Sequence, residues 1–166
     1  VDKVLFEVPD AVLGRDMLLI SRIAGVPANM GGFLSAGTRI NDQLVRLERV
    51  GERLLLRKHG TQAVADDTLP IARSVVSNNF APILAAFDIE AIGPDSLTAV
   101  IDVTEFYEGD TPALSGLRPG QRRTYQVRRL DPSRSFIQYA RSYPLNVNVR
   151  HTLTYDAGRS EERRGG

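Results

Sequence analysis

Cysteine and tryptophan are both absent from this 166-residue sequence, and histidine occurs only twice. Without cysteine the chain cannot form disulfides, thiolate metal sites or a cysteine nucleophile. The sequence therefore does not indicate whether the protein works in an oxidising or a reducing compartment. His59 and His151 each lack a second histidine four residues away, and no HExxH occurs. A zinc site would therefore need carboxylates as its remaining ligands. We expect His59 to lie in a turn, His151 on a strand face, and no metal or other cofactor to bind this chain.

Other catalytic motifs are missing as well. The sequence contains no GxSxG, no GxxxxGK[ST] and no GxGxxG. Ser35 lies in a glycine-rich stretch, but nothing places a base beside it. Three acids cluster at 105–110 without the spacing of a calcium loop, which favours a solvated turn. We therefore expect this chain not to be an enzyme by itself.

Long apolar runs are also absent, so the sequence predicts no membrane span. It begins at Val1 without a signal-peptide pattern, which suggests an excised or processed piece. A composition of 42% apolar and 25% charged residues is typical of one soluble domain. We predict a single β-rich domain over 1–156, and a disordered polar tail over 157–166 that contains no aliphatic or aromatic residue beyond Ala157.

The net charge of +1 hides an uneven distribution. Residues 62–110 hold one basic residue against nine acids, whereas residues 111–150 hold eight arginines against one acid. We favour mutual compensation of these two segments inside one fold. The alternative is that they form opposite faces that meet different partners.

The hydrophobic pattern predicts mainly antiparallel β structure, an α+β fold of about eight strands in hairpins or a sandwich-like sheet. Short apolar or alternating runs bounded by turn residues indicate the strands, and one hairpin turns at 50–51 and another at 93–96. These strands are expected at 4–8, 17–24, 43–49, 52–58, 83–92, 97–104, 124–130, 135–142 and 145–155.

One short helix is predicted near 69–78, where Asp66, Asp67 and Thr68 precede Leu69 and Pro70. The stretch 25–42 contains five glycines and no periodicity. It predicts a long loop, either a flexible connection or a lid.

Four residues are candidates for a structural role. Gly14, Arg15 and Asp16 form a forced turn between two apolar strands, where backbone groups need partners outside the ladder. We expect Arg15 to bind a carboxylate or carbonyls and Asp16 to accept backbone N–H groups. Phe87 lies on the apolar face of the strand 83–92 and is expected in the core.

The arginine-rich stretch 118–150 is the sharpest compositional signal. Arginine binds phosphates and aromatic rings stack on bases, so an anionic partner is one interpretation. No lysine and no RNA-binding motif accompany the arginines, so we expect them to pair with acids and do not expect nucleic acid as a partner. An anionic-partner surface would use Arg122, Arg123, Arg128, Arg129 and Arg134.

Two motifs carry a resemblance to a known family. The first is P-D-x-x-L-G-R-D-x-L-L-x-S-R over 9–22, and the second is R-S-[FY]-I followed by [FY]-P-x-N over 134–146. Together with the hairpin stretch 83–110, they resemble the uncharacterised domain that precedes the catalytic domain in large, secreted bacterial zinc-dependent metallopeptidases of the HExxH type. The resemblance covers nearly all of residues 1–156.

The resemblance implies a periplasmic or extracellular location and a parent protein that is a zinc-dependent hydrolase. In that family the zinc ligands and general base belong to a later domain, so no catalytic residue is carried over to this chain. Our first hypothesis is a non-catalytic accessory domain that scaffolds the downstream catalytic domain or helps hold a polypeptide substrate, for example by offering a sheet edge. The alternatives are a stand-alone binding module for an anionic partner, or an enzyme that depends on the loop 25–42.

Overall fold

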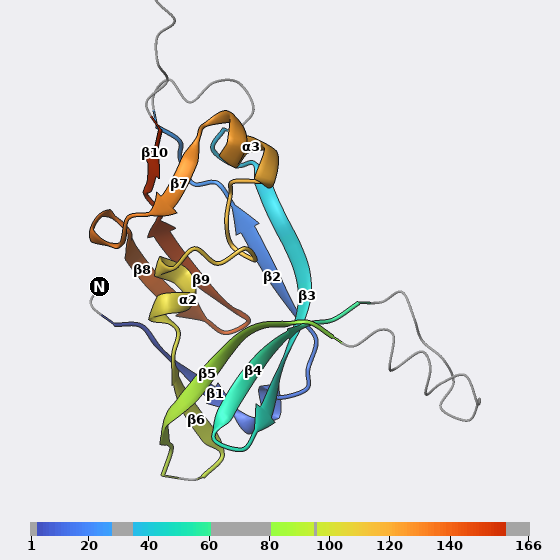
Figure 1. Cartoon of the computed structure of the whole chain (residues 1–166). Coiled ribbons are helices and arrows are strands. Elements are labelled where there is room, and N and C mark those ends of the chain that lie inside the picture. The colour runs from blue at the N-terminus through green and yellow to red at the C-terminus, as the bar shows by residue number, and fades with distance from the viewer. Residues whose placement is uncertain (1–2, 28–34, 61–80, 95, 159–166) are drawn as a thin grey trace, which may run out of the picture. The chain divides into compact units, whose positions relative to one another are not determined.

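The computed structural model describes residues 3–27, 35–60, 81–94 and 96–158. Within these ranges the chain forms ten strands in three antiparallel sheets, with two short α-helices (Figure 1). The predicted mainly antiparallel β architecture is therefore confirmed. The helix expected near 69–78, the middle of the loop 25–42 and the tail from residue 159 lie outside the described residues.

The chain divides into two compact units. The sheet unit comprises Leu5–Ser21 and Asn41–Asp102, and the hairpin unit comprises Val1–Val4, Arg22–Ile40 and Val103–Gly166. Six strands form the sheet of the first unit, in the order β1 (Leu5–Pro9), β6 (Thr98–Asp102), β5 (Ile83–Ile92), β4 (Arg53–Lys58), β3 (Arg39–Val50) and β2 (Met17–Arg22).

Alternation of apolar and polar residues builds the core of the sheet unit. Leu47 of β3 lies opposite Leu56 of β4, and both are buried. Leu54 and Ile101 are the most deeply buried large side chains of this unit, with at most 1% of their surface exposed. Burying one such side chain contributes roughly 1.5–3 kcal/mol. Gly51 has a φ of +60°, which lets the chain turn between β3 and β4.

The sheet curls because its two edge strands are consecutive in sequence. β1 and β2 lie at opposite edges, and only residues 10–16 join them. Six flat strands would separate the edges by about 24 Å, farther than seven residues reach when three form the 3-10 turn Asp10–Val12. The Gly14 amide donates to the Leu47 carbonyl at 2.9 Å, which fixes this connection beside β3. Pro9 is tolerated because β1 is an edge strand.

The hairpin unit contains the remaining elements. The helices are α2 (Thr104–Glu108) and α3 (Pro119–Thr124). β7 (Val127–Leu130) pairs with β10 (Tyr155–Ala157), and β8 (Phe136–Tyr143) pairs with β9 (Asn146–Thr152), with a 3-10 turn at Pro132–Arg134. Its buried apolar side chains are Val4, Val103, Phe106, Ala113, Leu114 and Ile137.

The hairpin unit corrects two sequence predictions. The strand expected at 124–130 begins only at Val127, because α3 occupies the residues before it. The strand expected at 145–155 is two strands, which pair with different partners on either side of residues 153–154.

Candidate functional site

The turn at Gly14–Asp16 joins the edge strands of the sheet unit. Gly14 has a φ of +72°, a conformation that favours glycine. Asp16 accepts a hydrogen bond from Arg46 Nε at 2.5 Å, and this guanidinium lowers the pKa of the carboxyl group. Among the residues that the structure describes, Asp16 thus binds a side chain of β3 rather than the expected backbone amides. Arg15 is exposed, and its guanidinium has no hydrogen-bond partner among the described residues.

Phe87 lies in the middle of β5, opposite Leu54 of β4. Its side chain is 8% exposed and belongs to the core of the sheet unit. Ile89 on the same strand is half-buried, whereas Ala91 is exposed, so the apolar face of β5 is covered only over part of its length.

Arg122 of α3 is the centre of a polar cluster in the hairpin unit. Its two terminal nitrogens bind both carboxylate oxygens of Asp110, and Nη2 also donates to Ser115 Oγ at 3.0 Å. The Tyr155 hydroxyl donates to Asp110 at 2.9 Å, and the Arg122 guanidinium lies 5.1 Å from the centre of the Tyr155 ring. Arg122 lowers the pKa of Asp110, and burial raises the pKa of Tyr155. This cluster ties the residues before α3 to β10.

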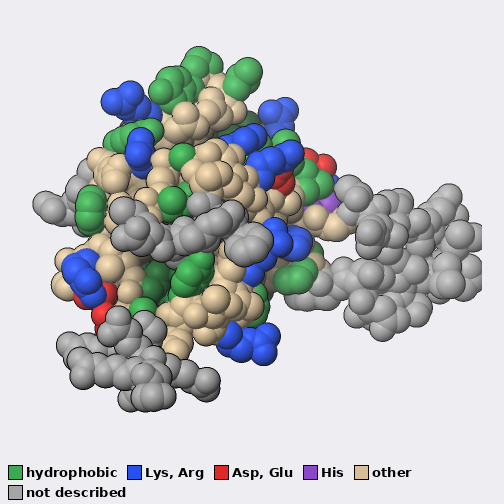
Figure 2. Space-filling model, turned by 90° about the horizontal axis from the view of Figure 1, so that it is seen from above, with side chains coloured by type: hydrophobic (Ala, Val, Ile, Leu, Met, Phe, Trp, Pro, Cys, Tyr) green, Lys and Arg blue, Asp and Glu red, His purple; other side chains and the backbone are tan. Residues whose placement is uncertain are grey.

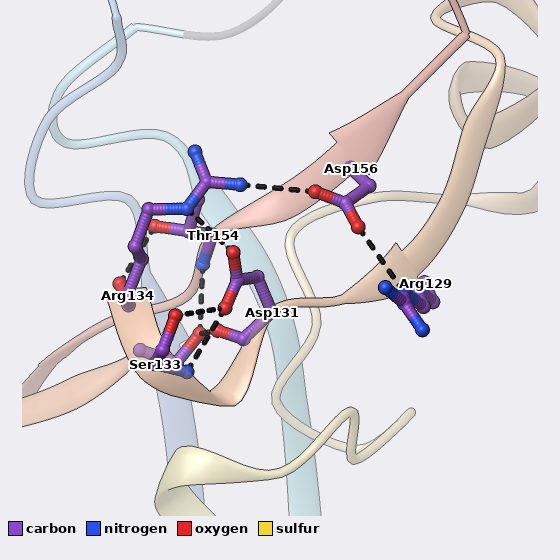
Figure 3. A network of polar contacts seen from close by, with 7 residues as sticks. Arg129, Asp131, Ser133, Arg134, Thr154 and Asp156 are labelled. Atoms are coloured by element: carbon purple, nitrogen blue, oxygen red, sulfur yellow. Dashed lines mark hydrogen bonds and ion pairs between the residues drawn. The ribbon is translucent and has the colours of Figure 1, made fainter.

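A second network joins β7, the 3-10 turn and β10 (Figure 3). Asp131 accepts hydrogen bonds from the Ser133 backbone N–H and hydroxyl and from Arg134 Nε, the last at 2.6 Å. The Ser133 hydroxyl and Arg134 lower the pKa of Asp131 to about 2. Arg134 also binds Asp156 at 2.9 Å, and Arg129 binds the other oxygen of Asp156 at 3.1 Å.

These contacts show how three arginines of the arginine-rich stretch pair with carboxylates. Arg122 pairs with Asp110 of the acidic segment, as the charge distribution suggested. Arg129 and Arg134 instead pair with Asp131 and Asp156, which lie outside that segment. On the face that Figure 2 shows, some blue side chains lie beside red ones and others do not. For these two arginines, compensation is therefore local to β7, β10 and the turn at Pro132–Arg134.

The five arginines proposed for an anionic-partner surface lie on different elements. Arg122 and Arg123 belong to α3, Arg128 and Arg129 to β7, and Arg134 to the 3-10 turn. Three of the five bind carboxylates of the same unit.

His151 lies on β9 and binds α2 through a side-chain hydrogen bond. Its Nδ1 binds the Tyr107 carbonyl, which can only accept, so the neutral ring carries its proton on Nδ1. Burial lowers the pKa of His151 and raises that of Tyr107 to about 12. Nearby, Glu108 accepts a hydrogen bond from the Ile137 amide at 3.1 Å. Across the described residues, no group of three or more histidines or acids is placed to hold a metal ion.

An open groove of about 620 Å³ runs beside α3. Its wall combines the start of β3, the loop before α3 and α3 itself. It is lined by Thr38, Arg39, Ile40, Gly116, Arg118, Gly120, Gln121, Thr124 and Tyr125.

The β8–β9 hairpin is the most exposed secondary structure of this unit. Ile137 at its base is fully buried, but every residue from 138 to 148 is exposed. Large apolar side chains are among them, and Leu145 at the tip is 98% exposed. Sequence reasoning noted tyrosines between the arginines here but did not identify the hairpin as a surface. The available signal was the alternation of Tyr139, Arg141 and Tyr143 before a Pro-Leu turn.

The fold and its polar clusters define an antiparallel β protein in which two networks of ion pairs and hydrogen bonds hold the loops of the hairpin unit to its strands. Two protein families match the sequence of this chain. The family described as Domain of unknown function (DUF5117) matches residues 37–165, and the one described as Domain of unknown function (DUF5118) matches residues 1–26. The chain therefore belongs to the DUF5117 family, in agreement with the expected uncharacterised domain.

The remaining comparisons add no relative of known function. No curated protein and no solved structure matches the chain. No helix within the described ranges is long and apolar enough to cross a membrane.

Proposed function

We propose that this chain is a non-catalytic accessory domain of a secreted, zinc metallopeptidase-like protein, and that it helps hold a polypeptide substrate for a downstream catalytic domain. The motifs at 9–22 and 134–146 support the link to such a parent protein. The observation that carries the substrate-holding role is the β8–β9 hairpin, which extends from its packed base with both faces exposed. β8 and β9 form a two-stranded sheet within the described residues, and extended polypeptides bind the edges of such sheets through main-chain hydrogen bonds.

The paired polar groups of the hairpin unit also support a non-catalytic role. Arg122 and Asp110 satisfy each other, and Asp131 accepts three hydrogen bonds. A general acid or base needs a site where substrate can reach its titrating atom. These groups instead join α3, β7 and β10 into a scaffold.

The alternative is a stand-alone module that binds an anionic partner through the arginines at 122–134. Ion pairs already occupy Arg122, Arg129 and Arg134, which weighs against a continuous phosphate-binding surface. Arg123 and Arg128 have no carboxylate partner among the described residues, so a weaker electrostatic attraction would still exist.

The parent gene provides the test. An HExxH motif within the few hundred residues that follow this domain would support the proposal, and its absence from the complete protein would overturn it. In a parent protein that carries the motif, removing the hairpin tip should reduce hydrolysis of a folded or extended polypeptide more than that of a dipeptide substrate.

A further inference from the structure

A β-bulge near the base of the hairpin decides which side chains share a face. Ile137 pairs with His151, but Tyr139 pairs with Arg150, and the register shifts between them. Neighbouring residues of β9 point to opposite faces, so Ile137 and Tyr139 also lie on opposite faces. Without the bulge, Tyr139 would share the buried face of Ile137. The outward face of β8 therefore carries an aromatic stripe made of Phe136, Tyr139, Arg141 and Tyr143.

The aromatic stripe is exposed along its whole length. Phe136 is 48% exposed, Tyr139 36% and Tyr143 47%, and Arg141 is exposed between the two tyrosines. A two-stranded hairpin without a covered face is marginally stable in water. Tyrosine and arginine are also the residues most enriched where binding energy concentrates at protein interfaces. The stripe thus has the composition of a contact surface.

The charge of the hairpin is of one sign. Residues 136–152 contain Arg141 and Arg150 and no acid. The Arg141 guanidinium lies 4.9 Å from the centre of the Tyr139 ring, an arrangement that holds it in place. No described carboxylate pairs with Arg141, in contrast to Arg122 and Arg134. An acidic group on a partner would supply the missing complement.

The backbone of β8 offers a second means of recognition. β8 and β9 form a two-stranded sheet, so the outer edge of β8 carries no strand within the described chain (Figure 1). No backbone hydrogen bond joins residues 138–143 to any other described part of the chain than β9. Such an edge presents unpaired N–H and C=O groups at the spacing of another strand.

We propose that the outer edge of β8 binds an extended, acidic segment of a substrate polypeptide as an added strand. Its backbone pairs with β8, and an acidic side chain on the outward face binds Arg141 between Tyr139 and Tyr143. The inference rests on the proposed substrate-holding function and specifies the substrate class. A polypeptide is favoured over a nucleic acid because only a peptide backbone can match the donors and acceptors of the edge.

Two synthetic octapeptides test the proposal on the complete 166-residue chain. One alternates Thr and Glu, and the other alternates Thr and Gln, so they differ in charge but share strand propensity. We expect the Glu peptide to bind and the Gln peptide to bind at least tenfold more weakly in isothermal titration. A third peptide, the Glu sequence with every backbone amide N-methylated, keeps the charge but has no backbone N–H to donate to β8 along either edge, and should also lose binding.

Matched variants locate the site. Arg141→Gln should weaken binding of the Glu peptide about tenfold or more, because hydrogen bonds to charged groups contribute strongly. Tyr143→Ser should weaken it in the same direction. Arg128→Gln removes the same charge from an exposed position on β7 and should leave binding unchanged. Circular dichroism of each variant shows whether it is folded.

Three results would overturn the proposal. The first is no binding of the Glu peptide at millimolar concentration, and the second is equal loss in Arg128→Gln and Arg141→Gln. The third is tighter binding of an oligonucleotide or of a second copy at the aromatic stripe, detected by competition and by sedimentation. None of these results changes whether an HExxH follows in the parent gene, so failure here is distinguishable from failure of the accessory-domain proposal.

Discussion

Phe87 is a large ring that the core of the sheet unit surrounds, 8% exposed and opposite the fully buried Leu54. Replacing it with alanine leaves a cavity as well as removing buried apolar surface. We expect Phe87→Ala to lower the free energy of unfolding by roughly 3–5 kcal/mol, measured by urea denaturation. Ile83→Ala on the same strand is the matched control, because Ile83 is 50% exposed and should cost much less. Equal losses would show that burial of Phe87 is not the cause.

Asp131 provides a test of the network in Figure 3. Its pKa of about 2 is held low first by the Ser133 hydroxyl and then by Arg134. Carboxyl titration by NMR should show this pKa rising toward 3.8 in Ser133→Ala, and also in Arg134→Gln. Arg129→Gln should leave it in place, because Arg129 binds Asp156.

The sign of the accompanying stability change follows from linkage. The folded-state pKa of Asp131 lies below the unfolded value, so the ionised carboxylate stabilises the fold above about pH 4. This contribution is lost as the pH falls from about 4 toward 2. A Ser133→Ala variant with an unchanged Asp131 titration would contradict the network.

At the scale of elements, the hydrogen bond from His151 of β9 to the Tyr107 carbonyl of α2 forms in a buried site that favours the neutral imidazole. Burial lowers its pKa below the usual 6.5, so the unfolded chain binds a proton more readily than the folded one. The free energy of unfolding should therefore fall as the pH drops below about 6.5. With only two histidines in the chain, NMR of the ring protons can follow His151 directly.

Two variants separate this effect from general acid sensitivity. In His151→Asn the amide Nδ2 can donate to the Tyr107 carbonyl without titrating, so the loss of stability between pH 6.5 and 5 should shrink. His59→Asn should retain it. A His151 ring with a pKa at or above 6.5 would contradict the burial of this side chain against α2.

Local sequence patterns predicted most strands of this protein. They failed where contacts with distant residues determine where an element begins or ends. The apolar run Leu54–Leu56 follows the turn at 50–51 and ends before His59 and Gly60, so β4 is readable from sequence alone. α3 is not, because its six residues carry no apolar stripe; Pro119 at its start and the Gln121 side chain bonded to the Arg118 amide hold it. Thr124, a good strand former, drew the predicted strand too early.

The division of β9 from β10 has a similar origin. Thr154 receives no local signal to end a strand, but its amide donates to Ser135 Oγ and its hydroxyl to the Arg134 carbonyl. Its own carbonyl accepts from the Asp131 amide. These bonds to distant residues turn the chain from β8 toward β7. The bulge that aims the aromatic stripe outward is equally invisible to periodicity, because it depends on the register of the partner strand.

At the scale of the whole molecule, the ion pairs limit what the arginines can do together. Arg122, Arg129 and Arg134 are engaged, which reduces the number of arginines at 111–150 that can displace counterions from a nucleic acid. A single-stranded oligonucleotide should bind weakly at low salt and be released at about 0.15 M salt, where non-specific binding typically has a Kd of ~10⁻⁴–10⁻⁶ M. Titration at two salt concentrations measures this. Sub-micromolar affinity that survives the higher salt would favour the anionic-partner module instead.

The two family matches meet inside one sheet. The match over 1–26 supplies β1 and β2, which are the two edges, whereas the match over 37–165 supplies the four strands between them. A fragment cut between the matches would present β3 and β6 as bare edges, an invitation to aggregate. Both matches therefore contribute strands to one sheet in this chain, and the residues of the shorter match close the two edges that the longer match leaves open.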